Sequence, residues 1–176
     1  MKEAGQRLMA LSISELIEEF RSWDKPRDGV GFNAFRLACT LEPGFGEAEL
    51  LDEWSATDEL PAELFEWWSY TGNADLFVDV DHGQWGLRIF GPAGCLERTS
   101  QERESRPDAY RATDLVLGEF LGDLELLVLT EQQNVLVALP LDPRDDWHEV
   151  GESLAQFFEQ YLGAIGEKFW ELKRTS

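Results

Sequence analysis

Few side chains in this sequence could act as a general base or bind a metal ion. The only histidines are His82 and His148. His82 follows Asp79 and Asp81, and such a cluster could hold a divalent cation or activate a substrate. Aspartate and histidine are also enriched at turns for backbone reasons, and a calcium loop would need a central glycine and a distant glutamate. We therefore interpret the cluster as a turn and predict no metal site.

The cysteines and the second histidine do not complete a catalytic arrangement. Cys39 and Cys95 have neither the number nor the spacing of a disulfide framework or a zinc site, so we expect reduced, partly buried thiols. His148 follows Asp145 and Asp146 near a predicted helix start, where acids suit the helix dipole. The chain has no P-loop, dinucleotide fingerprint or nucleophile elbow. These patterns predict a protein that is not an enzyme and has no cofactor.

A long segment without positive charge is the most informative pattern. No lysine or arginine occurs in the 51 residues between Arg36 and Arg88. The segment also holds four tryptophans and several leucines, and a disordered acidic tail would lack such apolar groups. A folded segment with a negative outer face favours binding of a basic partner. Its acids are Glu42, Glu47, Glu49, Asp52, Glu53, Asp58, Glu59, Glu63, Glu66, Asp75, Asp79 and Asp81.

The whole chain is acidic and has the length of one domain. Its 176 residues include 35 acidic and 15 basic side chains, for a net charge of −20. This charge argues against nucleic acid and against an anionic membrane as partners. Neither a membrane span nor a signal peptide is recognisable, so we expect a cytoplasmic protein, either a monomer or a weak homodimer. A general adaptation for solubility or salt is the alternative explanation of the charge.

Helices are predicted in the first part of the chain. Ser12 has the residue type of an N-cap, and apolar residues recur at helical spacing over 13–23. Residues 24–46 are rich in glycine and proline, which predicts a long connection with little regular structure. A second helix fits 47–55, and a third begins at Pro61 and stops at Thr71-Gly72-Asn73.

Strands are predicted after the third helix. Residues 76–80 and 84–90 form a hairpin around Asp81-His82-Gly83. Residues 96–112 are polar, hold four arginines and are interpreted as partly helical or mobile. The remaining predicted elements are strands over 115–121, 124–130 and 134–139, a helix over 146–162 and a short helical piece over 166–172.

The order of these elements predicts an α+β fold. Consecutive strands joined by short turns pair antiparallel, because a parallel crossover needs a dozen or more residues. We expect one domain over 1–176, with a mainly antiparallel central sheet and helices packed on one side.

Two adjacent tryptophans lie in the predicted third helix. Successive helical side chains point about 100° apart, so we expect at least one of Trp67 and Trp68 to be half exposed. An exposed Trp68 could anchor a partner, because tryptophan is enriched among interface hot spots. The alternative is that Trp68 covers the edge of the core.

Residues 47–163 carry the pattern of a known family. The first half contains Leu60-Pro61, then Leu64, Phe65, Trp67, Trp68 and Thr71-Gly72-Asn73. The second half contains Asp114 to Gly118, strands through Leu129 and Leu139, then Trp147 and the run from Ser153 to Leu162. This pattern resembles the SUKH superfamily. Two departures are Gly72-Asn73, which inverts the usual Asn-Gly order, and Thr130, where an aspartate is often found.

The resemblance implies an α+β fold with helices on a central sheet. Bacterial members are mostly similar to immunity proteins, which bind and neutralise a cognate secreted toxin, and fungal relatives are scaffold-like regulators of cell-wall synthesis and signalling. The absence of an aspartate at Thr130 weakens the transfer of a polar site to that strand end.

The charge pattern and the resemblance together predict a binding function. We expect a non-catalytic immunity protein for a toxin with a basic surface, such as a nuclease. The alternatives are an intracellular scaffold or regulatory module, and an enzyme that uses His82 with Asp79 and Asp81. The predicted contact surface runs from helix 47–55 through the hairpin. The predicted partner-binding residues are Glu47, Glu49, Asp52, Glu53, Trp68, Asp79, Asp81 and His82.

Overall fold

The computed structural model describes residues 11–30, 35–54 and 59–172. The helices are α2 (Ile13–Arg21), α3 (Glu47–Glu53), α4 (Ala62–Tyr70), α5 (Pro92–Ser105), the 3-10 turn η1 (Arg144–Asp146), α6 (Leu154–Gly163) and α7 (Phe169–Leu172). The strands are β1 (Arg27–Asp28), β2 (Arg36–Pro43), β3 (Thr71–Asp79), β4 (Leu87–Ile89), β5 (Leu115–Phe120), β6 (Leu126–Leu129), β7 (Val135–Ala138) and β8 (His148–Gly151).

The strands of the described residues form one eight-stranded sheet in the order of the sequence, from β1 to β8. Every neighbouring pair is antiparallel. This confirms the predicted α+β class with an antiparallel sheet. The arrangement follows from the connections, because turns, the helix pair α3–α4 and the helix α5 each return the next strand beside the one before it.

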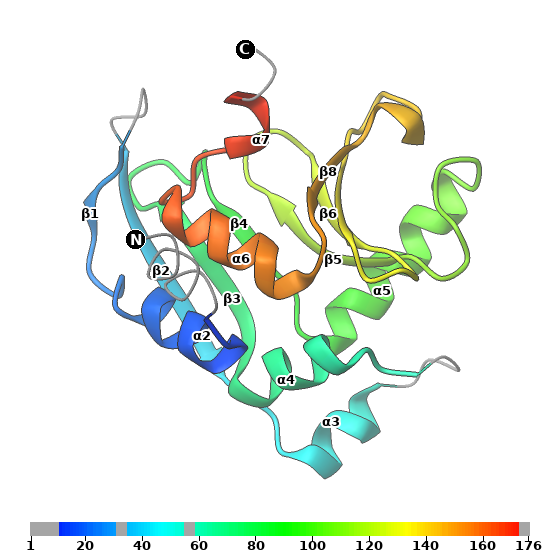
Figure 1. Cartoon of the computed structure of the whole chain (residues 1–176), viewed down its shortest axis with the longest axis horizontal. Helices are drawn as coiled ribbons and strands as arrows, with labels where there is room; N and C mark the ends of the chain where they lie inside the picture. The colour runs from blue at the N-terminus through cyan, green and yellow to red at the C-terminus, as the bar shows by residue number, and fades with distance from the viewer. Residues whose placement is uncertain (1–10, 31–34, 55–58, 173–176) are drawn as a thin grey trace, which may run out of the picture.

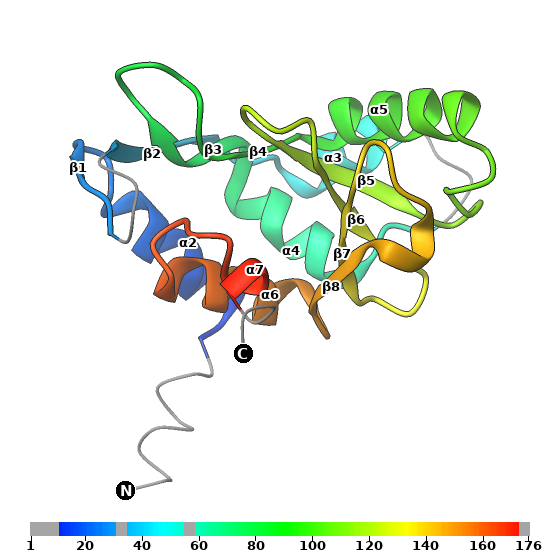
Figure 2. The same ribbon diagram turned by 90° about the horizontal axis from the view of Figure 1, so that it is seen from above.

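The helices lie on both sides of the sheet. Figures 1 and 2 show α2, α4 and α6 grouped on one side, as predicted, with α2 in contact with both of the others. Figure 2 shows α5 on the opposite side. Helix α5 packs along β5, where the Thr99 hydroxyl accepts a hydrogen bond from the Val116 amide at 2.8 Å. The polar, arginine-rich segment is therefore an ordered helix over most of its length.

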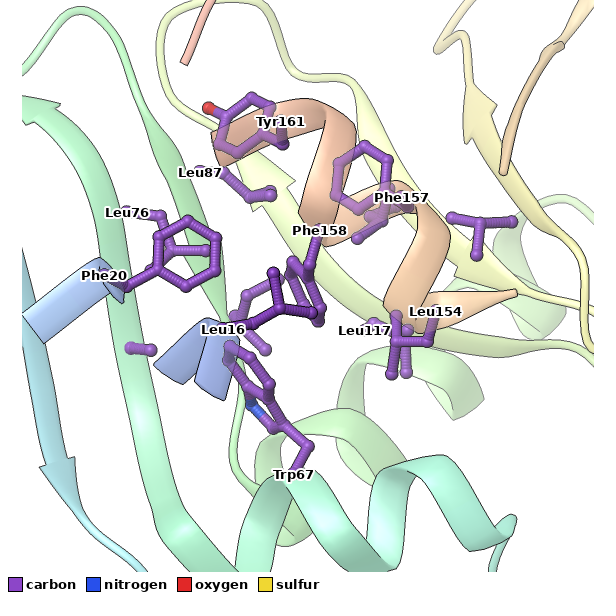
Figure 3. Close-up of a cluster of buried hydrophobic side chains, with 14 of the residues drawn as sticks. Leu16, Phe20, Trp67, Leu76, Leu87, Leu117, Leu154, Phe157, Phe158 and Tyr161 are labelled. Carbon is purple, nitrogen blue, oxygen red and sulfur yellow. The ribbon is translucent and has the colours of Figure 1, made fainter. Parts of the chain in front are cut away.

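The main core forms where α2, α4 and α6 meet (Figure 3). Trp67 of α4 stacks on Phe158 of α6 with ring centroids 4.2 Å apart, and Phe20 of α2 packs edge-on against both rings. These three side chains are 0–1% exposed. Large aromatic rings dominate the apolar area that a core buries, so this contact holds the three helices together.

A second, smaller core lies on the other face of β5, β6 and β7. Val116, Val128 and Ala138 pack there with Tyr110 and Trp147. All four residues of β6 are buried because this strand is covered on both faces. A strand buried on both faces has a continuous apolar sequence rather than an alternating one.

The prediction of little regular structure over residues 24–46 was wrong. β2 occupies Arg36–Pro43 and pairs with β3 over most of its length, with two irregularities in register. The strand has few local signals because glycine and proline flank it. Its pairing partner, β3, lies about thirty residues further along the chain, and tertiary context decides such a strand.

Two further boundaries differ from the prediction. Thr71-Gly72-Asn73 does not form a stop followed by a loop, since β3 begins at Thr71, directly after α4. The predicted helix over 146–162 is η1, then β8, then α6. Ser153 is the N-cap of α6, and its hydroxyl accepts a hydrogen bond from the Gln156 amide at 3.1 Å. His148 thus lies in an edge strand and not at a helix start.

Candidate partner-binding surface

Several acids of the segment between Arg36 and Arg88 make hydrogen bonds or ion pairs within the protein and are not free to bind a partner. Glu63 of α4 accepts hydrogen bonds from the Leu154 and Ala155 amides at 2.8 and 3.1 Å. These amides belong to the first turn of α6, where the backbone N–H groups have no helical partner. A carboxylate there also interacts favourably with the helix dipole. The role of Glu63 is therefore to join α4 to α6.

Asp79 is a structural residue and not a surface contact. It is 1% exposed. One carboxylate oxygen accepts from the Asp81 and His82 amides at 3.0 and 3.2 Å, and the other accepts from the Gln84 amide at 3.4 Å. The carboxylate thus holds the β3–β4 turn, and its prediction as a partner-binding residue was wrong. No cluster of His, Cys, Asp and Glu suited to a metal ion occurs within residues 11–30, 35–54 and 59–172.

The arginines at the two boundaries of the segment fold back onto its acids. Arg36 lies 3.1 Å from Asp81, and this hydrogen-bonded ion pair lowers the pKa of the Asp81 carboxyl. Arg88 lies 3.0 Å from Asp75. Pairing of β2 with β3 and of β3 with β4 brings these residues together. The segment without lysine or arginine therefore has two of its acids neutralised by the arginines that flank it in the sequence.

Three of the four arginines of the polar segment make internal contacts. Arg98 pairs with Glu102 at 3.0 Å. Arg103 donates to the Asp114 carbonyl, and Arg106 donates to the Leu139 carbonyl. Arg103 and Arg106 thus attach the C-terminal end of α5 to loops at the ends of β5 and β7.

Trp68 is a core residue, so its prediction as an exposed anchor was wrong. Trp67 and Trp68 are both 0% exposed. The Trp68 indole N–H donates to the Phe90 carbonyl at 2.9 Å, and its ring lies 5.7 Å from that of Trp54. Helix α4 has packing partners in both directions, which is why two adjacent side chains are both buried.

The predicted contact surface is divided between two ends of the sheet. β3 has nine residues, which corresponds to roughly 30 Å at about 3.3 Å per residue. Helix α3 lies near its first residue, and the turn with Asp81 and His82 follows its last. Figure 1 shows α3 at the bottom and the β3–β4 connection at the top. Asp81 and His82 are exposed, but they are not beside the acids of α3.

Acids without a cationic partner gather on α3 and α4. All are exposed, and none takes part in an ion pair between described residues. Glu49 is also exposed, and its carboxylate accepts from the Gly46 amide at 3.3 Å, which caps α3. The other members of this group are Glu47, Asp52, Glu53, Glu59 and Glu66.

An apolar hollow of about 530 Å³ lies between α3 and the start of α4, and of these acids Glu59 lines it. Its apolar lining comes from Leu51, Trp54, Leu60 and Phe65. Leu51 is 54% exposed, whereas its neighbour Leu50 is 0% exposed. We call these four side chains, with the unpaired acids Glu47, Asp52, Glu53, Glu59 and Glu66, the α3–α4 surface.

The sequence held a signal for this hollow that the prediction missed. Adjacent helical residues point about 100° apart, and this argument applies to Leu50 and Leu51 as it does to Trp67 and Trp68. It fails for the tryptophans because α4 is packed in two directions. It holds for the leucines because α3 has packing partners on one side.

Both cysteines are free and buried. Burial raises the pKa of each thiol to about 12, so neither is a thiolate at neutral pH. They behave as small apolar core residues, in agreement with their prediction as reduced thiols.

Comparison with known proteins gives no relative from which a role could be transferred. No protein-family model matches the chain, and no curated protein matches it either. Among the described helices, none is both long and apolar enough to cross a membrane.

Proposed function

We propose that this chain is a cytoplasmic, non-catalytic immunity protein, which neutralises a cognate secreted toxin by occupying the toxin's functional surface. The α3–α4 surface is the contact site. The single observation that carries this proposal is an apolar hollow on the same pair of helices as several exposed carboxylates, none of which has a cationic partner among the described residues.

The physical reason is that charged and apolar groups contribute differently to protein recognition. Exposed charges of one sign steer an oppositely charged partner and raise its association rate. Apolar and aromatic side chains at the centre of a contact supply most of the affinity. Leu51, Leu60 and Phe65 provide such a centre, with Glu59 beside them in the same hollow.

The negative charge of the α3–α4 surface indicates the kind of toxin. Nucleases are attractive partners, because a nucleic-acid substrate requires a basic groove in the enzyme that cleaves it. An acidic protein can fill that groove in place of the substrate. The resemblance to the SUKH superfamily supports this proposal independently of charge.

The first test is protection from a neighbouring gene product. The variable C-terminal domain of a large secreted protein encoded beside this gene should be toxic when expressed in a bacterial host. Co-expression of the present chain should restore growth. Absence of such a gene, or toxicity without protection, would contradict the immunity role and favour a scaffold or regulatory module.

The second test locates the contact by charge reversal. The triple variant Glu47→Lys, Asp52→Lys and Glu53→Lys should slow association with the toxin domain by about tenfold or more at low salt and weaken its salt dependence. Glu49 is left intact because it caps α3. Stopped-flow fluorescence over a range of salt concentrations measures the rates.

A matched control separates local from global electrostatics. The triple variant Glu18→Lys, Glu104→Lys and Asp108→Lys changes the net charge by the same amount at exposed positions outside the α3–α4 surface. Its association rate should stay closer to wild type than that of the first variant. Equal effects in the two triple variants would exclude α3 as the contact.

A further inference from the structure

A second surface lies at the end of the β6–β7 ladder. Leu126 pairs with Ala138, so the loop before β6 and the loop after β7 lie at the same end of the sheet. These loops, residues 121–125 and 139–142, line a hollow of about 490 Å³ together with Glu171 of α7. We call this the leucine-loop surface.

The two loops expose large apolar side chains. Leu124 is 77% exposed and Leu141 is 93% exposed, the highest values among the exposed large hydrophobic residues described. Single exposed leucines are common. Here Leu141 lines the hollow, and Leu124 lies between the lining residues Asp123 and Glu125. Two exposed leucines so placed are a stronger signal for an interaction surface.

The backbone conformation at position 124 does not favour leucine. Its φ is 63°, in the left-handed region where glycine, asparagine and aspartate are preferred and other residues are strained. Neither burial nor conformation explains a leucine at this position. Strain of this kind, in a side chain that contributes nothing to the core, is typical of residues kept for function.

The charges around the hollow define what can bind. Its lining holds the acids Asp123, Glu125, Asp142 and Glu171 and no lysine or arginine. Lys168 pairs with Asp123 and with Glu125.

Cations near the hollow leave part of this negative charge uncompensated. Arg106 donates to the backbone carbonyl oxygens of Leu139 and Asp142, and the Asp142 carboxylate is not its acceptor. Asp142 and Glu171 take part in no ion pair between described residues.

We propose that the leucine-loop surface is a second protein-binding site, which takes a short basic segment with aliphatic side chains from a protein other than this chain. The exposed leucines contact the aliphatic side chains of the segment, and the exposed carboxylates of Asp142 and Glu171 pair with its lysines or arginines. A second copy of this strongly acidic chain is disfavoured by like-charge repulsion.

This site is separate from the α3–α4 surface. Figure 1 shows α7 and the β5–β6 connection at the top of the molecule and α3 at the bottom. The inference does not rest on the proposed immunity function, and either can fail without the other.

Peptide selection tests the site with a defined probe. A random peptide library displayed on phage is first depleted on the double variant Leu124→Asn and Leu141→Ser and then selected on the wild-type chain. The recovered peptides should combine lysine or arginine with leucine, isoleucine, valine or phenylalanine. Synthetic copies should bind wild type at least about tenfold more tightly than the double variant, as expected for the loss of anchor side chains.

The variants are chosen to keep the fold. Asparagine tolerates the left-handed conformation, and Leu141 makes little contact with the core, so the double variant should melt at or above the wild-type temperature. Leu51→Ser, on the α3–α4 surface, is the matched control and should leave the affinity for these peptides unchanged.

Three results would overturn the proposal. The first is that no recovered peptide distinguishes wild type from the double variant. The second is that the recovered peptides are acidic or lack charge. The third is that light scattering finds a wild-type dimer and a monomeric double variant, since the occupant would then be a second copy.

Discussion

Trp68 illustrates how a single residue depends on more than its own helix. Its ring contacts Trp54, and its indole N–H bonds to the Phe90 carbonyl, while the adjacent Trp67 stacks on Phe158. The two side chains point in different directions, and each direction is filled by another part of the chain. A position on a helical wheel indicates where a side chain points but not what lies there.

Replacing Trp68 by alanine should therefore destabilise the protein. We expect a loss of about 3–5 kcal/mol in the free energy of unfolding, typical of a large aromatic removed from a core. Urea denaturation measures it. Tyr70→Ala is the control in the same helix, because Tyr70 is 49% exposed, and it should change stability by about 0.5 kcal/mol or less. Similar losses in the two variants would contradict the assignment of Trp68 to the core.

At the scale of elements, Glu63 joins two helices that are distant in sequence. It lies in the first turn of α4 and accepts hydrogen bonds from the first turn of α6. One carboxylate thus lies near the positive ends of two helix dipoles. The charge pattern of the sequence assigned Glu63 to the negative outer face. In the structure it instead caps the N-terminus of α6, 91 residues further along the chain.

Glu63→Ala should weaken the attachment of α6. The Leu154 and Ala155 amides would lose their acceptors, which costs about 1–3 kcal/mol for partly buried groups. Denaturation gives the total, and amide hydrogen exchange at Leu154 and Ala155 should accelerate. Glu66→Ala, at an exposed position one turn further along α4, should leave both quantities nearly unchanged. Unaltered exchange at the two amides in Glu63→Ala would exclude the capping role.

The helices and strands also differ in how well local sequence patterns predict them. Helix α2 has a capping box at Ser12 and a regular apolar stripe, and it lies where the spacing predicted it. β2 and β8 have short, mixed sequences and owe their conformation to pairing with β3 and β7. Their hydrogen-bond partners are set by the sheet, so local propensity alone could not predict them.

At the scale of the whole molecule, the net charge of −20 opposes the compact state. Repulsion between exposed carboxylates extends over about 30 Å at 0.01 M salt and about 10 Å at 0.1 M. Many of the described cations neutralise particular acids, as in the pairs Arg36–Asp81 and Arg88–Asp75. Within the part of the chain that the structure describes, the carboxylates of the α3–α4 surface have no cationic partner.

Added salt should therefore raise the melting temperature. For a chain of this size, each 1 kcal/mol of relieved repulsion corresponds to roughly 2–4 °C. Calorimetry in increasing sodium chloride measures the effect. The triple variant Glu47→Lys, Asp52→Lys and Glu53→Lys should gain less from salt than wild type. A melting temperature that falls with salt in the wild-type chain would show that ion pairs outweigh repulsion.

The sequence by itself determined the α+β class, the buried thiols and the location of excess negative charge. Each of these follows from composition or from short-range spacing, such as the apolar stripe of α2 and the close succession of strands after Leu115. It also marked Glu47, Asp52 and Glu53 as surface residues, because they are charged side chains in a folded segment that has no lysine or arginine.

Only the tertiary structure decided which acids are free to bind a partner. Glu63 and Asp79 accept hydrogen bonds from backbone amides, and Asp75 and Asp81 form ion pairs with arginines from neighbouring strands. It also separated α3 from the β3–β4 turn by the length of a strand and brought the loops of Leu124 and Leu141 together. The physical reason is that hydrogen bonds and ion pairs form between residues that are close in space, and the sheet sets that proximity.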